Sequence, residues 1–132
     1  MLVHWLWLAH RPSVTDHMKA VLLEHFSDPE DIYFARPSDF SHIDGLTGEM
    51  AQALSDKDLA TAEKHLADAM KYKLHIMTYR DAVYPKRLKH ISDPPLVLYY
   101  KGTLPDFDGS PVIGVVGTRK ATAYGLTTAK RM

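Results

Sequence analysis

The sequence contains no cysteine among its 132 residues, so it can form neither a disulfide bond nor a thiolate metal site. It has no excess of charge either, because 16 basic and 16 acidic residues balance. No apolar run approaches the ~18 residues of a membrane-spanning helix. The apolar start, residues 1–10, lacks the preceding basic residue and the following cleavage site of a signal peptide. We therefore expect a cytoplasmic protein without a membrane partner.

Acidic residues are absent from residues 111–132, whose charged side chains are Arg119, Lys120, Lys130 and Arg131. Within this basic stretch lies VIGVVGTRKATAYG, residues 112–125. It contains neither G-x-G-x-x-G nor G-x-x-x-x-G-K-[ST], so it is neither a dinucleotide fingerprint nor a P-loop. An apolar run, a glycine, a basic pair and a helix-forming stretch predict a strand, a turn and a helix.

The predicted turn has the residue types of an anion site. Gly117 lets the backbone approach a ligand, Thr118 offers a hydroxyl, and Arg119 offers a planar fork for phosphate oxygens. Lys120 adds a second cation, and a helix beginning near residues 121–122 would point its positive end at the same place. The stretch supplies no nucleophile, general base or metal ligand. We expect it to hold a phosphate without catalysis, cofactor or metal.

The first part of the chain, residues 1–72, is patterned as short helices. Residues 2–9 are apolar on nearly all sides, which predicts a buried helix with Trp5 and Trp7 in the core. Ser13 stands three positions before Asp16, a capping-box pattern. Residues 39–54 resemble the hairpin of a helix-hairpin-helix motif, which can offer backbone N–H groups to a DNA phosphate. A plain connection between helices, with positive φ at Gly45 and Thr47 as the cap, accounts for the same residues.

The pattern changes near residue 73. Three segments, residues 75–79, 96–102 and 112–118, are rich in β-branched, aromatic or apolar residues. Such runs suit parallel strands that are covered on both faces. The sequence therefore predicts an α+β chain with a helical domain at 1–72 and, at 73–132, about three strands of an incomplete α/β domain. The eight histidines invite a metal site, but His65 and Asp68 are a helically spaced pair without a third ligand nearby.

Several linked motifs follow in order after residue 84. They are Tyr84-Pro85, Leu88, Asp93-Pro94-Pro95, Val97-Leu98-Tyr99, Lys101-Gly102, Val116 to Arg119, and Tyr124-Gly125. Together they resemble the DNA-processing protein A family, also called DprA or Smf. The resemblance is strong over residues 84–125, and the helical part shares only its general character.

This resemblance implies a non-catalytic protein that binds single-stranded DNA through an extended Rossmann-like domain. It also implies loading of the recombinase RecA onto DNA during natural transformation, and a homodimer in the full-length protein. Residues 1–72 would then be a sterile-alpha-motif-like (SAM-like) domain, and 73–132 the truncated start of the Rossmann-like domain. Gly117, Thr118, Arg119 and Lys120 would grip DNA phosphates, supported by Thr122, Tyr124 and Gly125. We expect the chain by itself to bind DNA weakly or not at all, and to self-associate or be partly disordered near its end.

Two other classes of function remain open from the residues alone. The first is a nucleotide-hydrolysing Rossmann-type enzyme resembling a cytokinin-activating phosphoribohydrolase, which needs a second glycine-rich segment with a catalytic arginine and glutamate. The second is a protein-interaction module in which the helical part binds a partner and the basic turn plays no role.

Overall fold

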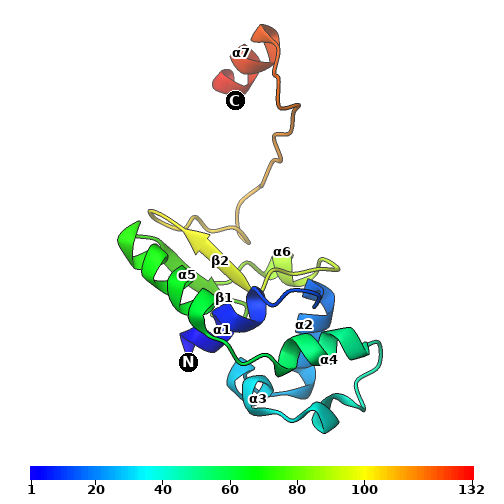
Figure 1. Ribbon diagram of the computed structural model, residues 1–132. Helices are drawn as coiled ribbons and strands as arrows, with labels where there is room; N and C mark the ends of the chain where they lie inside the picture. Colours follow the sequence, from blue (N-terminus) through cyan, green and yellow to red (C-terminus); the bar gives the residue numbers. More distant parts are fainter.

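A computed structural model describes residues 1–132 and shows a compact helical body, a two-stranded sheet beside it and a C-terminal extension (Figure 1). The elements are α1 (Leu2–Ala9), α2 (Asp16–His25), α3 (Pro29–Phe34), the short 3-10 helix η1 (Pro37–Phe40), α4 (Gly48–Ser55), α5 (Ala60–Lys71), β1 (His75–Thr78), α6 (Lys86–Lys89), β2 (Val97–Tyr100) and α7 (Ala123–Arg131). The α+β class is confirmed.

Side-chain caps fix where the early helices begin. Asp28 accepts a hydrogen bond from the N–H of Glu30 at the start of α3, and Thr47 accepts one from Met50 at the start of α4. Gly45 has φ +80°, so the plain connection before α4 has the predicted backbone. The predicted cap at Ser13 is wrong. Thr15 caps α2 instead, because Ser13 adopts φ +61°, outside the extended region that N-cap residues use.

The core is built around α1, as its nearly all-apolar sequence predicts. Trp7, Leu6 and Leu8 are almost completely inaccessible to solvent, and Trp5 is buried beside them. The core also takes in Leu96, with Ile76 and Val97 packed against it from the sheet. Helices and sheet thus share apolar packing in this structure, and a domain boundary at residue 72 stays a prediction.

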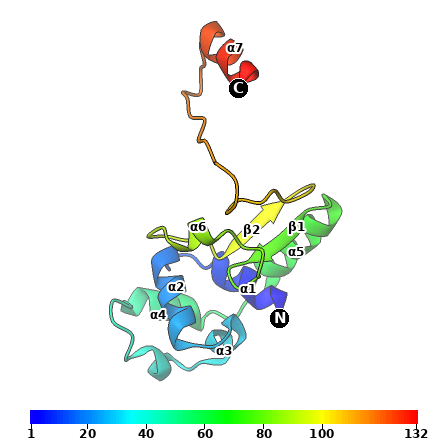
Figure 2. The ribbon, with the colours of Figure 1, turned by 180° about the vertical axis from the view of Figure 1, so that it is seen from behind.

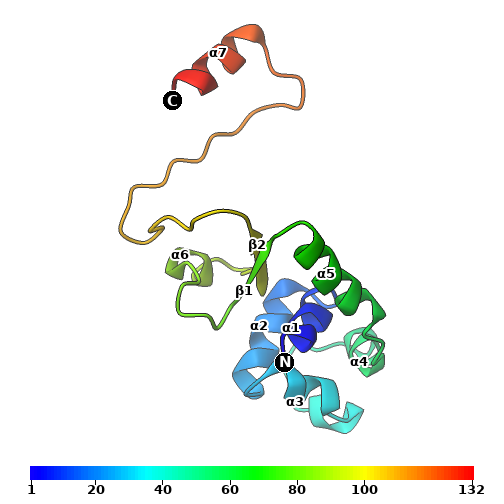
Figure 3. The same cartoon turned by 90° about the vertical axis from the view of Figure 1, so that its left-hand side faces the viewer.

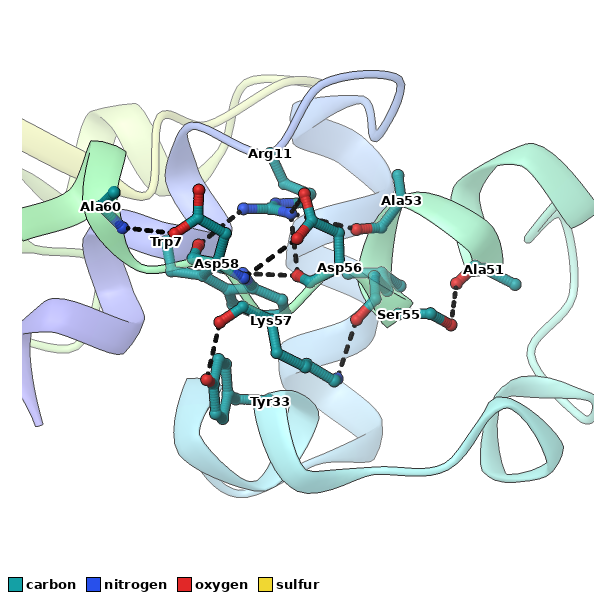
Figure 4. Close-up of polar contacts among 11 residues, drawn as sticks. Trp7, Arg11, Tyr33, Ala51, Ala53, Ser55, Asp56, Lys57, Asp58 and Ala60 are labelled. Atoms are coloured by element: carbon teal, nitrogen blue, oxygen red, sulfur yellow. Dashed lines mark hydrogen bonds and ion pairs between the residues drawn. The ribbon is translucent and has the colours of Figure 1, made fainter.

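A buried arginine ties the connection between α4 and α5 to α1 (Figure 4). Arg11 donates hydrogen bonds to the carbonyl oxygens of Ala53, Asp56 and Asp58 at 3.3, 2.8 and 3.3 Å, and its guanidinium lies 2.9 Å from the Asp56 carboxylate. The indole N–H of Trp7 donates to the same Asp56 carbonyl at 3.1 Å. These bonds satisfy carbonyls where α4 ends, so the chain can turn there with its backbone acceptors paired, while the Nε of Arg11 has no partner.

The two strands pair antiparallel, with His75 opposite Tyr100 and Thr78 opposite Val97. This corrects the expectation of parallel strands. Parallel strands need coverage on both faces, whereas this sheet packs one face on the helices. Its other face borders an open apolar groove of about 410 Å³, lined by residues such as Met77, Leu98 and Phe107.

The third predicted strand is also wrong, because residues 112–117 form no regular element. Figure 3 shows this segment running away from the body toward α7. A strand exists only where a neighbour accepts and donates its backbone hydrogen bonds, and here the segment has no neighbouring strand. Its valines and isoleucine are therefore exposed, with Val116 at 95%.

No helix of the structure is both long and apolar enough to cross a membrane. No group of three or more histidine, aspartate or glutamate side chains is arranged to hold a metal ion. His65, named above as a ligand candidate, instead stacks on His10 with ring centroids 4.0 Å apart.

Candidate nucleic-acid interface

The start of α7 offers free backbone donors. Thr122 is its N-cap, and the threonine hydroxyl accepts a hydrogen bond from the N–H of Gly125 at 3.1 Å. The N–H groups of Ala123 and Tyr124 make no hydrogen bond in the structure. Because unpaired N–H groups and the helix dipole both favour negative charge, this end of α7 suits an anion.

The turn before α7 carries the predicted phosphate-binding residues in an open conformation. The Thr118 hydroxyl donates to the carbonyl oxygen of Lys120 at 2.8 Å, which bends the chain between them. Neither a left-handed φ nor a close neighbour requires glycine at position 117, since a Cβ there would meet no atom within 4 Å. Its role in letting a ligand approach the backbone stays a prediction.

Positive charge is concentrated and unpaired in this segment. Every residue from 109 to 132 is exposed, and Arg119 and Lys120 take part in no ion pair. Two cations of α6 are engaged by neighbouring residues instead. The Arg87 guanidinium donates to the carbonyl oxygen of Asp108 at 3.3 Å, and the ammonium of Lys89 lies 4.9 Å from the centre of the Tyr79 ring. The free cations of the C-terminal segment are therefore better placed for an external anion.

The structure brings only some of the predicted residues together. Gly117, Thr118, Tyr124 and Gly125 border one hollow of about 560 Å³ between the extended segment and α7, whereas Arg119, Lys120 and Thr122 are outside its lining. Most of the lining is apolar, from residues such as Ile113 and Val116. The charged groups thus stand at the outside of the turn, where a phosphate can reach them from solvent.

A second group of cations lies at the end of the sheet, and sequence reasoning missed it. Lys71, Tyr72, Lys73 and His75 are all exposed there, beside the end of β2. The signal was available in the run KYKLH, which combines two lysines with two ring side chains and no acid. Its significance depends on which strand pairs with residues 75–78, which the sequence did not reveal.

Comparison with known proteins agrees with the motifs in the second half of the chain. A family described as DNA recombination-mediator protein A matches residues 75–132. Protein Smf of Synechocystis is 28% identical over 98% of this chain, which corresponds to 33% of the relative. DNA processing protein DprA of Bacillus subtilis is 52% identical over 32% of this chain and 14% of the relative.

Protein Smf of Borreliella burgdorferi is 39% identical over 51% of the chain and 20% of the relative. The chain therefore spans a third or less of the length of these relatives. No solved structure matches it. The matched motifs and relatives agree: residues 75–132 match the DNA recombination-mediator protein A family, and the chain is similar to proteins named Smf and DprA.

Proposed function

We propose that this chain binds single-stranded DNA at the turn Gly117–Lys120 and the start of α7, without catalysis. The observation that carries the proposal is the acid-free segment 111–132, in which unpaired cations stand directly before a helix with free N–H groups. A phosphodiester there would accept hydrogen bonds from the backbone N–H of Ala123 or Tyr124 and from the Arg119 guanidinium.

Such a site reads the phosphate backbone and no base edge. Binding should therefore be indifferent to sequence and should weaken steeply with salt, because phosphate neutralisation releases counterions. Bases left free in this way remain available for pairing. This supports a role in presenting DNA to a RecA-type recombinase during DNA uptake and recombination.

The same proposal extends to architecture and assembly. We propose that residues 1–72 form a SAM-like unit and that 73–132 begin a Rossmann-like domain, in which residues 112–117 become a strand once a neighbour pairs with them. Ile113, Val115 and Val116 are 74, 65 and 95% exposed. Apolar side chains in that number favour contact with more of the protein or with a second copy, and a homodimer fits this.

Substitutions of Arg119 test whether the turn binds single-stranded DNA. Arg119→Ala should weaken binding of fluorescent oligo-dT by about 1–3 kcal/mol, the range for losing a charged hydrogen-bond partner. Arg119→Lys should recover part of the loss, because an ammonium cannot make the bidentate contact. The matched control is Arg131→Ala, which removes the same charge from the last turn of α7. Polarisation should be measured at about 50 and 200 mM salt.

Three results would contradict the proposal. If Arg119→Ala folds and binds as tightly as the unaltered chain, the turn is structural. If the chain releases the base from nucleoside monophosphates, the phosphoribohydrolase-like alternative gains support. If no oligonucleotide binds and a protein partner does, the interaction module is the better description.

A further inference from the structure

The end of α5, the start of β1 and the end of β2 lie together at one end of the sheet (Figures 1 and 2). The sequence places aromatic residues and lysines in these three segments. The antiparallel register sets His75 opposite Tyr100, and their rings stack with centroids 4.9 Å apart and planes 20° from parallel. Tyr72, the residue after α5 and three positions before His75, is 57% exposed. We refer to this cluster as the aromatic–lysine patch, consisting of Lys71, Tyr72, Lys73, His75, Tyr100 and Lys101.

The lysines of the aromatic–lysine patch have no acidic partner. Lys71, Lys73 and Lys101 are exposed and take part in none of the five ion pairs of the structure. Residues 69–80 and 94–105, which build this end of the molecule, contain no aspartate or glutamate. The Lys71 ammonium instead lies 5.4 Å from the centre of the Tyr72 ring. Positive charge is therefore available here to an external anion.

Lys73 occupies a backbone position that favours glycine. Its φ is +54°, and the N–H groups of Lys73 and Leu74 donate to the carbonyl oxygens of Met70 and Ala69, the two bonds of a Schellman motif that ends α5. A lysine in the left-handed region is strained relative to glycine. A cation near a helix C-terminus interacts favourably with the helix dipole, but Lys101 follows a strand and gains nothing from it.

Gly102 turns the chain directly after Lys101, where its φ is +88°. The loop that follows returns along the sheet, since Leu104 and Phe107 line the apolar groove together with Tyr100. Tyr72, His75 and the three lysines of the patch remain exposed.

We propose that the aromatic–lysine patch is a second contact surface for single-stranded DNA, separate from the turn at Gly117–Lys120. Exposed aromatic rings are platforms on which unpaired bases stack, and flanking lysines neutralise the phosphates between those bases. A duplex would not fit this chemistry, because its base faces are already stacked on one another. The inference rests on the proposed function only in its choice of ligand.

The first experiment removes charge without weakening the fold. Lys73→Gly combined with Lys101→Gln takes away two cations, and the glycine relieves the strained φ. The double variant should bind oligo-dT about tenfold more weakly at about 50 mM salt, with the slope of log K against log salt reduced by about 1.4 for two lost phosphate contacts on a single strand. The control variant, Arg36→Gln with Lys86→Gln, loses the same charge from exposed positions elsewhere and should keep the original slope.

The second experiment tests stacking. Tyr72→Ala should lower affinity about tenfold, the loss expected for one stacked base, with little change in the salt slope because no charge is removed. Oligonucleotides carrying 5-iodouracil should form photo-crosslinks to peptides that contain Tyr72, His75 or Tyr100.

The outcomes separate this inference from the proposed function. If Arg119→Ala weakens binding while the patch variants bind normally and no patch peptide crosslinks, this inference is wrong. The proposal that the turn at Gly117–Lys120 binds DNA is then still supported. If the patch variants lose affinity and Arg119→Ala does not, the inference holds and the turn is not the site. If nothing binds, both fail. If a polyglutamate peptide displaces the DNA at equal charge concentration, the patch is a general site for acidic polymers and the inference is overturned.

Discussion

Replacing Arg11 with methionine should destabilise the helical body strongly while leaving its overall shape intact. Arg11 is only 8% exposed, and it satisfies three carbonyl oxygens, one in the last turn of α4 and two in the connection to α5. Methionine keeps an unbranched apolar stem at this position, so the change isolates the loss of the guanidinium, whose central carbon lies 5.0 Å from the centre of the Trp7 ring. The perturbation therefore tests whether backbone carbonyls buried at a helix end depend on this one side chain.

The size of the effect follows from the contacts. A hydrogen bond to a charged group contributes about 1.5–3 kcal/mol, and the 2.8 Å bond to the Asp56 carbonyl belongs in that range. The two bonds at 3.3 Å contribute less, and the Trp7 indole still satisfies the Asp56 carbonyl after the change. The Asp56 side chain is 62% exposed, so its ion pair adds at most about 1 kcal/mol. We expect Arg11→Met to lower the free energy of unfolding by about 3 kcal/mol.

Urea unfolding followed by circular dichroism measures this change, with the dependence on urea concentration expected to stay the same. The control is Arg36→Met, since Arg36 has an 81% exposed side chain with one ion pair at 3.5 Å. That variant should change stability by less than about 1 kcal/mol. A loss below about 1 kcal/mol for Arg11→Met would show that water replaces the guanidinium easily, and the reasoning from burial would be refuted.

Two further predictions concern pH. Burial, the neighbouring His65 and Lys19 lower the pKa of His10 below 6.5, so the unfolded chain takes up its proton before the folded chain does. Above pH 6.5, His10 should therefore leave the free energy of unfolding unchanged, and below it that free energy should fall as the pH drops. His10→Gln should make this fall smaller in urea titrations at several pH values. Burial, with smaller contributions from Tyr79 and Asp16, raises the pKa of Tyr84 to about 12. The protonated Tyr84 hydroxyl should therefore contribute its full stabilisation below pH 10, and this contribution should be lost as the pH rises toward 12. Tyr84→Phe removes the 2.7 Å hydrogen bond to the Pro95 carbonyl and should cost about 1 kcal/mol near neutral pH, with one ionisation step near pH 12 missing from the phenolate absorbance. An unchanged absorbance titration would show that another tyrosine accounts for that step.

Local chemistry in the sequence was sufficient to predict several elements. The apolar run at residues 2–9 became the buried α1, and Asp28 before Pro29 became a capped helix start. Thr122 and the helix after it also lie where the motif at 112–125 placed a helix. Each of these depends on residues that are close together in the sequence, such as a helix cap or a short apolar run. Such local patterns can be recognised from the sequence without knowing the tertiary structure.

Pairing between distant segments was decided only by the tertiary structure. The runs at 75–79 and 96–102 carried no signal for their direction, and antiparallel pairing follows from packing one sheet face on α1 and α5. Residues 112–117 have the composition of a strand but no partner, so the same composition gives an extended, exposed segment. The strand register also formed the aromatic–lysine patch, because it pairs His75, the first residue of β1, with Tyr100, the last residue of β2. A sequence specifies which groups are available, whereas hydrogen bonds and burial between distant residues determine which of them meet.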